Sequence, residues 1–203
     1  MHRMILAFAA LMATPSAQAA SPVSGLEKFL PIGAAVEARV DADLTGDGLI
    51  DVAAVAVKDD ERLLVVVAGS PRGLVKVGQT AMDPSPLGSA ELKVARGVLI
   101  VDDLTGGTTA LSSTYRWRYD PVRRKMRLIG DDVSLYSRTW AHDGRDVSTN
   151  RLTGVQISTF QKLKGRGENA TYVPSKPVRK TISRDPIYMG DEPTPERTMG
   201  WGN

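Results

Sequence analysis

The chain has 203 residues, with 26 lysines and arginines against 23 aspartates and glutamates, and it contains no cysteine. This length suffices for one domain with its own hydrophobic core. The lack of cysteine excludes a disulfide framework, thiolate catalysis and a lipid-modified cysteine. We therefore expect one domain that is stabilised mainly by packing.

The first 19 residues have the pattern of a secretory signal peptide. Residues 1–3 form a short basic region that contains Arg3, and residues 5–12 are apolar. Ala17-Gln18-Ala19 matches a small-x-small cleavage site. The alternative is a transmembrane anchor, but the apolar run is too short to span a bilayer. We expect no such anchor and an exported protein, either periplasmic or secreted.

Downstream, short apolar runs alternate with turn clusters. Residues 25–30 predict a short helix that ends before Pro31, because the residue before a proline is disfavoured in helical conformation. Strands are predicted at residues 35–40, 50–57, 63–67, 91–94, 98–101, 115–119, 125–130, 133–137, 152–160 and 178–183.

No sustained helical period follows, so the pattern predicts a mainly β fold. The expected architecture is a single antiparallel, meander-like sheet domain, either a sandwich or a partly closed barrel, with one short N-terminal helix. This β domain covers residues 20–189. Residues 190–203 lack an apolar period and are expected to form a flexible C-terminal tail.

The sharpest chemical signal is the acidic loop, residues 43–51, with the sequence Asp-Leu-Thr-Gly-Asp-Gly-Leu-Ile-Asp. Oxygen donors at its first, third and fifth positions converge on one hard cation if the backbone turns tightly, and Gly48 at the sixth position permits that turn. The predicted ion is calcium (Ca²⁺). Its predicted ligands are the side chains of Asp43, Thr45, Asp47 and Asp51 and the carbonyl of Leu49.

The loop differs from a helix–loop–helix calcium site, because Ala54 stands at its twelfth position and a strand follows. With a neutral Thr45, we expect a dissociation constant on the order of 10⁻⁴ to 10⁻³ M. The alternative is a turn without an ion, in which the carboxylates cap backbone amides. A look-alike turn begins at Asp103 but has Gly107 and Leu111 in place of the later carboxylates, so it should hold no metal.

The acidic loop resembles those of FG-GAP or VCBS-type segments, whose usual form is Asp-x-Asn-Gly-Asp-Gly-x-x-Asp before an apolar strand. The match departs at Thr45. Together with residues 26–31, 115–119 and 127–130, the loop also resembles a group of exported bacterial proteins that carry one such loop. The resemblance implies calcium binding. It implies little about architecture, because FG-GAP loops occur in propellers of many blades and one copy cannot build a propeller.

A second group is the basic hairpin, residues 115–127. Tyr115-Arg116-Trp117-Arg118-Tyr119 alternates, so its aromatic side chains and its arginines fall on opposite faces of a strand. The hypothesis is binding of an anionic envelope polymer. The alternative is a solvated sheet face whose charges prevent aggregation. The candidate residues are Arg116, Arg118, Arg123, Arg124, Lys125 and Arg127.

Signals for catalysis are weak. After signal cleavage the chain keeps one histidine, His142, in a polar stretch without a nucleophile motif, so we expect a solvated loop residue. Our first hypothesis is a non-catalytic exported β domain with a calcium loop and a structural or interaction role. The alternatives are the anionic-polymer binder and a hydrolase with two distant carboxylates. The partner is expected to be an envelope or extracellular protein or an anionic polymer, and not nucleic acid.

Overall fold

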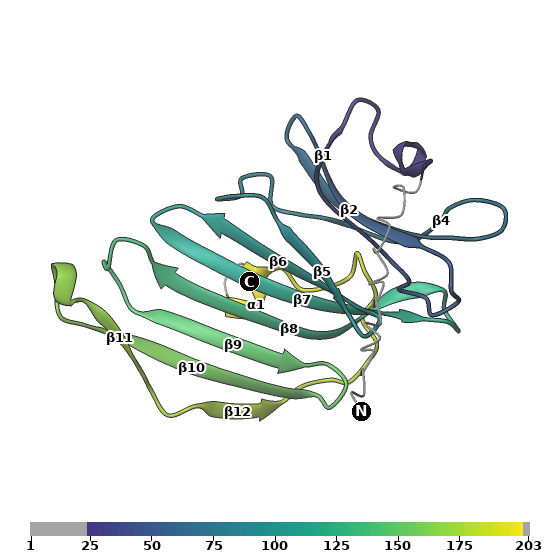
Figure 1. Ribbon diagram of the computed structural model, residues 1–203. Helices are drawn as coiled ribbons and strands as arrows, with labels where there is room; N and C mark the ends of the chain where they lie inside the picture. The colour runs from purple at the N-terminus through teal and green to yellow at the C-terminus, as the bar shows by residue number, and fades with distance from the viewer. Residues whose placement is uncertain (1–23, 201–203) are drawn as a thin grey trace, which may run out of the picture.

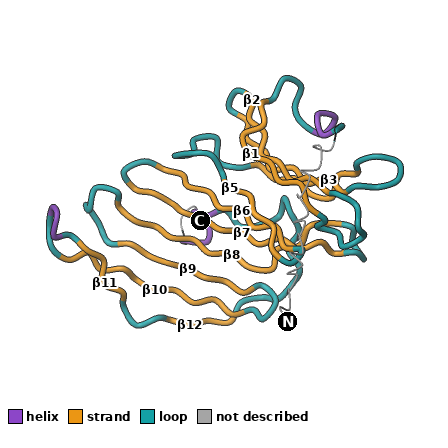
Figure 2. The backbone as a smooth tube through the Cα atoms, viewed as in Figure 1, coloured by secondary structure: helices purple, strands orange, loops and turns teal. Residues whose placement is uncertain are grey.

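The computed structural model describes residues 24–200. The predicted signal peptide, residues 1–19, and residues 201–203 of the predicted tail lie outside the described residues. The described part is built from two antiparallel sheets (Figure 1, Figure 2). This confirms the mainly β, antiparallel prediction, and neither sheet closes into a barrel within residues 24–200. No helix in this described part is long and apolar enough to cross a membrane.

The small sheet is a four-stranded meander. Val52 and Ala54 point to one side of β2, and Ala53 and Val55 point to the other, yet all four are fully buried. The two central strands are therefore covered on both faces, as their continuous apolar runs predict. In sheet order, the strands are β1 (Ala35–Ala42), β2 (Asp51–Lys58), β3 (Glu61–Ala68) and β4 (Val75–Ala81).

The large sheet has eight strands, and both β11 and β12 pair with β10 at one edge. On β7 the predicted alternation is confirmed, because Trp117 lies in the core and its neighbour Arg118 is exposed. The strands are β5 (Glu91–Ala95), β6 (Val98–Gly106), β7 (Thr109–Asp120), β8 (Lys125–Ser137), β9 (Gly144–Asn150), β10 (Val155–Lys164), β11 (Thr171–Pro174) and β12 (Val178–Thr181).

Three of the strands, β4, β9 and β11, lie outside the segments that the sequence pattern predicts as strands. β4 contains Gly78 and Gln79, and β9 is mostly polar, with Val147 as its one large apolar residue. Neither segment shows the regular alternation that predicts a half-buried strand. Pairing with apolar neighbours, and not local propensity, therefore decides their conformation.

The two sheets share one hydrophobic core. Its buried side chains come from both sheets and include Val55, Leu64, Val66, Val77, Leu99, Trp117, Met126 and Leu128. The other face of the small sheet is covered by Leu26 and its neighbours in η1 (Leu26–Phe29). The predicted N-terminal helix is therefore a four-residue 3-10 turn and not an α-helix. The reason is that Leu30 becomes extended before Pro31.

The C-terminal segment, residues 190–200, differs from the predicted flexible tail. It packs against the inner face of the large sheet, where Met199 is buried beside Val133 and Val147. The short helix α1 (Pro195–Met199) follows Thr194, whose hydroxyl accepts a hydrogen bond from the Arg197 amide at 3.3 Å. A five-residue helix has no readable period, so only the packing reveals the order of this segment.

Candidate functional site

The acidic loop joins β1 to β2 and turns tightly. Gly46 and Gly48 have φ values of +79° and +84°, the left-handed region that glycine favours. The carboxylate of Asp43 accepts hydrogen bonds from the amides of Gly46 at 2.7 Å and Gly48 at 3.0 Å. Asp47 accepts one from the Leu49 amide at 2.9 Å. The predicted role of Gly48 in the turn is therefore confirmed.

Asp51 closes the loop and is fully buried. One of its oxygens accepts hydrogen bonds from the amides of Leu44 and Thr45, at 2.7 and 2.8 Å. The other accepts one from the Gly69 amide at 2.8 Å, so Asp51 ties the loop to the turn after β3. A side chain at Gly69 would put its Cβ 2.6 Å from the Ile50 carbonyl oxygen, so this close approach requires glycine.

The five predicted calcium ligands thus lie on one short loop, but they differ in exposure. Asp47 and Leu49 are exposed, whereas the Thr45 hydroxyl oxygen is buried and has no hydrogen-bond partner among the described residues. Within residues 24–200, no group of three His, Cys, Asp or Glu side chains is arranged to hold a metal ion. The calcium ligand set stays a prediction.

The basic hairpin is formed by β7 and β8. Arg118 stands directly opposite Arg127 in the strand register. Arg116 is the member with an acidic partner, since it forms an ion pair with Asp132 at 2.7 Å. The other candidate residues, Arg123, Arg124 and Lys125, are exposed at the turn end of the hairpin.

A buried ion cluster, which we call the Arg62 cluster, joins the two sheets. Arg62 is 2% exposed, and each of its five N–H groups has an acceptor. Two bonds go to Glu37 of β1 at 2.8 and 2.7 Å, and two go to Asp103 of β6 at 2.8 and 2.9 Å. The fifth goes to the Asp83 carbonyl at 3.1 Å.

These contacts lower the pKa of the acid Glu37 and raise the pKa of the base Arg62. The hydrogen bond from Arg62 lowers the pKa of Glu37, and this outweighs the opposing effect of burial. Burial by itself lowers the pKa of Arg62, but the hydrogen bonds to Glu37 and Asp103 outweigh it and raise that pKa. The charged forms of Glu37 and Arg62 therefore stabilise each other.

The sequence pattern gives no sign of this cluster. Arg62 lies just before the predicted strand at residues 63–67, and Asp103 begins the look-alike of the acidic loop, but both residues lie within strands, β3 and β6. The three charged side chains come from strands that are far apart in the chain. No local signal could identify them as partners.

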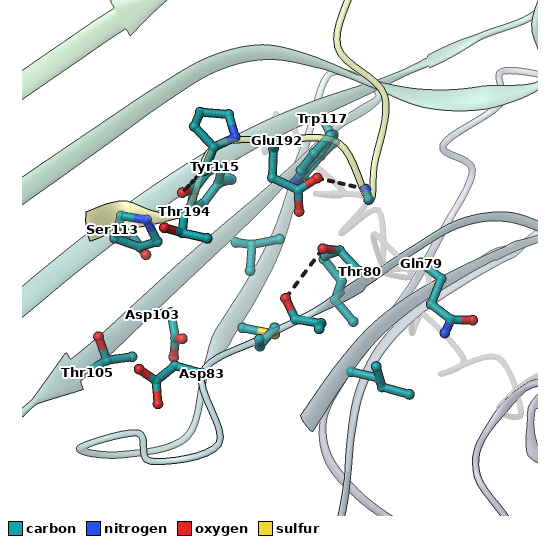
Figure 3. Close-up of a pocket in the computed structure, with 18 of the residues that line it drawn as sticks. Gln79, Thr80, Asp83, Asp103, Thr105, Ser113, Tyr115, Trp117, Glu192 and Thr194 are labelled. Atoms are coloured by element: carbon teal, nitrogen blue, oxygen red, sulfur yellow. Dashed lines mark hydrogen bonds between the residues drawn. The ribbon is translucent and has the colours of Figure 1, made fainter. Parts of the chain in front are cut away.

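A cavity of about 690 Å³ lies between the two sheets, next to the Arg62 cluster (Figure 3). β3 and β4 form one wall, β6 and β7 form another, and the C-terminal segment closes a third side. Its acidic lining residues come from three separate parts of the chain and are Asp83, Asp103, Glu192 and Glu196. The cavity depends on the C-terminal segment, so a sequence that predicts a flexible tail cannot predict it.

Two observations bear on catalysis. Of the acids in the cavity, Asp103 is bound by Arg62, and Glu192 accepts a hydrogen bond from the Gly190 amide at 2.7 Å. His142 is not among the lining residues. Its ring nitrogens contact the Thr109 hydroxyl at 2.8 Å and the Asp143 carbonyl at 2.6 Å.

Comparisons of this chain with protein-family models, with curated proteins and with solved structures find no match. The resemblance to FG-GAP and VCBS-type segments therefore depends on the loop residues themselves. The acidic loop, the basic hairpin and the cavity are the three features from which a function can be argued.

Proposed function

We propose that this protein is a non-catalytic exported β domain whose acidic loop binds calcium, with a structural or interaction role. The observation that carries the proposal is the Thr45 hydroxyl, which is buried without a partner among the described residues at the third position of the loop. A buried oxygen without a partner costs about 1–3 kcal/mol. A cation in the loop would provide the missing partner.

The remaining loop oxygens keep lone pairs that a hard cation would use. Each oxygen of Asp43 accepts a single amide hydrogen and keeps a lone pair, and only one oxygen of Asp47 accepts a hydrogen bond among the described residues. The exposed Leu49 supplies its carbonyl. A carboxylate has about four lone-pair positions, so the three amides at Asp51 leave one of them for the ion.

The surrounding architecture also supports the proposal. The loop connects the first two strands of a four-stranded antiparallel sheet, the kind of sheet that forms one blade of a propeller. Here the large sheet and η1 cover the faces of this single sheet. An ion in the loop would stabilise one end of the small sheet through Asp51 and its bond to Gly69.

The test is thermal unfolding of the full chain in calcium and in chelator. Binding to the native state alone should add roughly 2.7 kcal/mol at one hundred times the dissociation constant, which raises the melting temperature by several degrees. Asp47→Ala should abolish this increase, because it removes an exposed ligand. If millimolar calcium and chelator give the same wild-type melting curve, the calcium proposal is wrong.

Asp60→Ala is the matched control for Asp47→Ala. Asp60 is an exposed aspartate in the turn between β2 and β3, at the opposite end of β2 from the acidic loop. Its substitution should leave the calcium response intact. Asp103 is unsuitable as a control because it is bound to Arg62.

We favour this non-catalytic role over a hydrolase. A hydrolase of the two-carboxylate type needs one acid that can donate a proton and a second that can act as base or nucleophile. In the cavity, Asp103 accepts two hydrogen bonds from Arg62, and one oxygen of Glu192 accepts the Gly190 amide. Both carboxylates therefore already serve as hydrogen-bond acceptors within the protein.

A second candidate function is binding of an anionic envelope polymer by the basic hairpin. The observation that favours it is the cross-strand pair of Arg118 and Arg127, since like charges directly opposite each other destabilise a sheet. Arg123, Arg124 and Lys125 add positive charge and make no ion pair with any described residue. A polyanion along this end of the hairpin would relieve the repulsion.

Retention on a dextran sulfate column tests this second function. Retention should fall steeply with salt, and Arg118→Ala combined with Arg123→Ala should weaken it. The control combines Arg72→Ala with Lys76→Ala, which removes two exposed charges, one from the turn after β3 and one from β4. Equal retention of the two double variants would exclude the hairpin as the binding surface.

A further inference from the structure

We propose that the cavity between the two sheets binds a small organic cation that has an apolar body and an oxygen acceptor. This site is separate from the calcium loop, because no residue of the acidic loop lines it. The proposal depends on the size of the cavity, on one buried donor without a partner among the described residues, and on the charge of the walls.

The size and the walls suit a small molecule. A volume of about 690 Å³ falls within the range of roughly 300–1,000 Å³ that is typical of ligand pockets. The floor is apolar, with Leu64 and Val101 from opposite sheets, and Met82 adds a further apolar side chain. An apolar body would replace water at this surface.

Trp117 provides an unused donor at the cavity. The side chain is 1% exposed, and its indole N–H has no hydrogen-bond partner among the described residues. Buried donors in native proteins are nearly always paired. The hydroxyls of Ser113 and Thr105, from side chains that are also almost fully buried, line the same space. An oxygen acceptor on the ligand would satisfy the indole N–H.

The charge of the walls selects a cation. Among the described residues, four carboxylates line the cavity, and the one lining side chain with a positive charge is Lys76. Arg62, behind the wall, is shared between Glu37 and Asp103 and so does not neutralise the rest. Figure 3 shows Glu192 on the side of the C-terminal segment, well apart from Asp83 and Asp103. Carboxylates therefore line the cavity on more than one side.

The aromatic wall points to the same class of ligand. The rings of Tyr115 and Trp117 are stacked, with centroids 6.3 Å apart, and aromatic faces attract organic cations. Burial raises the pKa of the Tyr115 phenol, and the charges of Asp131, Glu192 and Glu196 act in the same direction. The Tyr115 ring, which is one of the stacked pair, therefore lies in a negative field.

The C-terminal segment is part of this site. The Tyr115 hydroxyl donates a hydrogen bond to the Pro193 carbonyl at 2.7 Å, which holds the segment over the cavity. Glu192 lies one residue before Pro193 and lines the cavity from this segment. A ligand would thus contact both sheets and the segment together.

Three probes of similar shape test the proposal by calorimetric titration of the full chain: 2-phenoxyethylamine, 2-phenoxyethanol and phenoxyacetate. They share a ring and an ether oxygen and differ in charge. We expect the amine to bind roughly tenfold more tightly than the neutral alcohol, and phenoxyacetate to bind most weakly. Equal affinities, preference for phenoxyacetate, or no binding of the amine at 10 mM would each overturn the proposal.

Substitutions of cavity residues test whether the probes bind in the cavity. Glu192→Gln should weaken the amine by roughly tenfold while leaving the alcohol unchanged, because only the charge differs. Asp191→Asn, an exposed neighbour that does not line the cavity, is the matched control. Trp117→Phe should weaken all three probes, since it removes the indole N–H that meets their shared ether oxygen. If Glu192→Gln and Asp191→Asn reduce amine binding equally, the cavity is not the site.

Discussion

The acidic loop and the Arg62 cluster both hold charged side chains through hydrogen bonds, but these bonds span different distances along the chain. Asp51 accepts the amides of Leu44 and Thr45, seven and six residues away, and reaches Gly69 at a separation of 18. Arg62 binds Glu37 at a separation of 25 and Asp103 at a separation of 41. The loop is thus mainly local, whereas the cluster exists only after the two sheets have packed together.

The two regions also differ in the charge they bury. Asp51 is one carboxylate that neutral backbone amides satisfy. The Arg62 cluster holds one buried guanidinium between two part-buried carboxylates, so removal of the arginine leaves two negative charges without their cationic partner. Breaking a buried ion pair costs more than losing hydrogen bonds to neutral amides. The cluster should therefore be the more sensitive of the two regions.

Arg62→Ala is expected to have the largest effect, a loss of about 3–5 kcal/mol in the free energy of unfolding, because Glu37 and Asp103 stay largely shielded from water without their cationic partner. Urea denaturation of the variant and the wild type measures this loss. Arg72→Ala, at an exposed arginine in the turn after β3, is the control and should change the free energy by less than about 0.5 kcal/mol. Similar losses in both variants would show that the cluster does not stabilise the fold.

Asp51→Ala should have the next largest effect, a loss of about 2–3 kcal/mol, because the amides of Leu44, Thr45 and Gly69 lose their shared acceptor. Asp51→Asn keeps one acceptor oxygen and should lose less. Both values come from the same urea experiment in chelator, which removes any contribution of calcium. If Asp51→Asn is as destabilising as Asp51→Ala, the number of amide hydrogen bonds is not what stabilises the loop.

Gly48→Ala should have the smallest effect, a loss of about 1–2 kcal/mol in the free energy of unfolding, because φ is +84° at this position. An added Cβ meets no atom within 4 Å, so the cost is conformational and not steric. Gly88→Ala is the matched control: its Cβ is equally free and its φ lies outside the left-handed region. Urea denaturation should show Gly88→Ala to be neutral or slightly stabilising. A neutral Gly48→Ala would contradict the role of Gly48 in the turn.

Local patterns in the sequence are sufficient for the parts of this protein whose contacts are local. The apolar run of residues 63–67 predicts the buried strand β3, and the alternation from Tyr115 to Tyr119 predicts which face of β7 enters the core. The tight turn of the acidic loop can be predicted for the same reason. Gly48 permits the turn, and Asp51 accepts hydrogen bonds from amides six and seven residues away.

Tertiary structure alone decides the rest. Nothing near Arg62 in the sequence indicates its partners, because Glu37 and Asp103 lie on the distant strands β1 and β6. The C-terminal segment has no hydrophobic period that predicts a helix or strand. Its position is set by Met199, which packs against apolar side chains of the large sheet. The cavity needs both sheets and this segment at once. Sequence patterns report preferences over a few residues, whereas burial and charge pairing between distant strands depend on how the sheets pack.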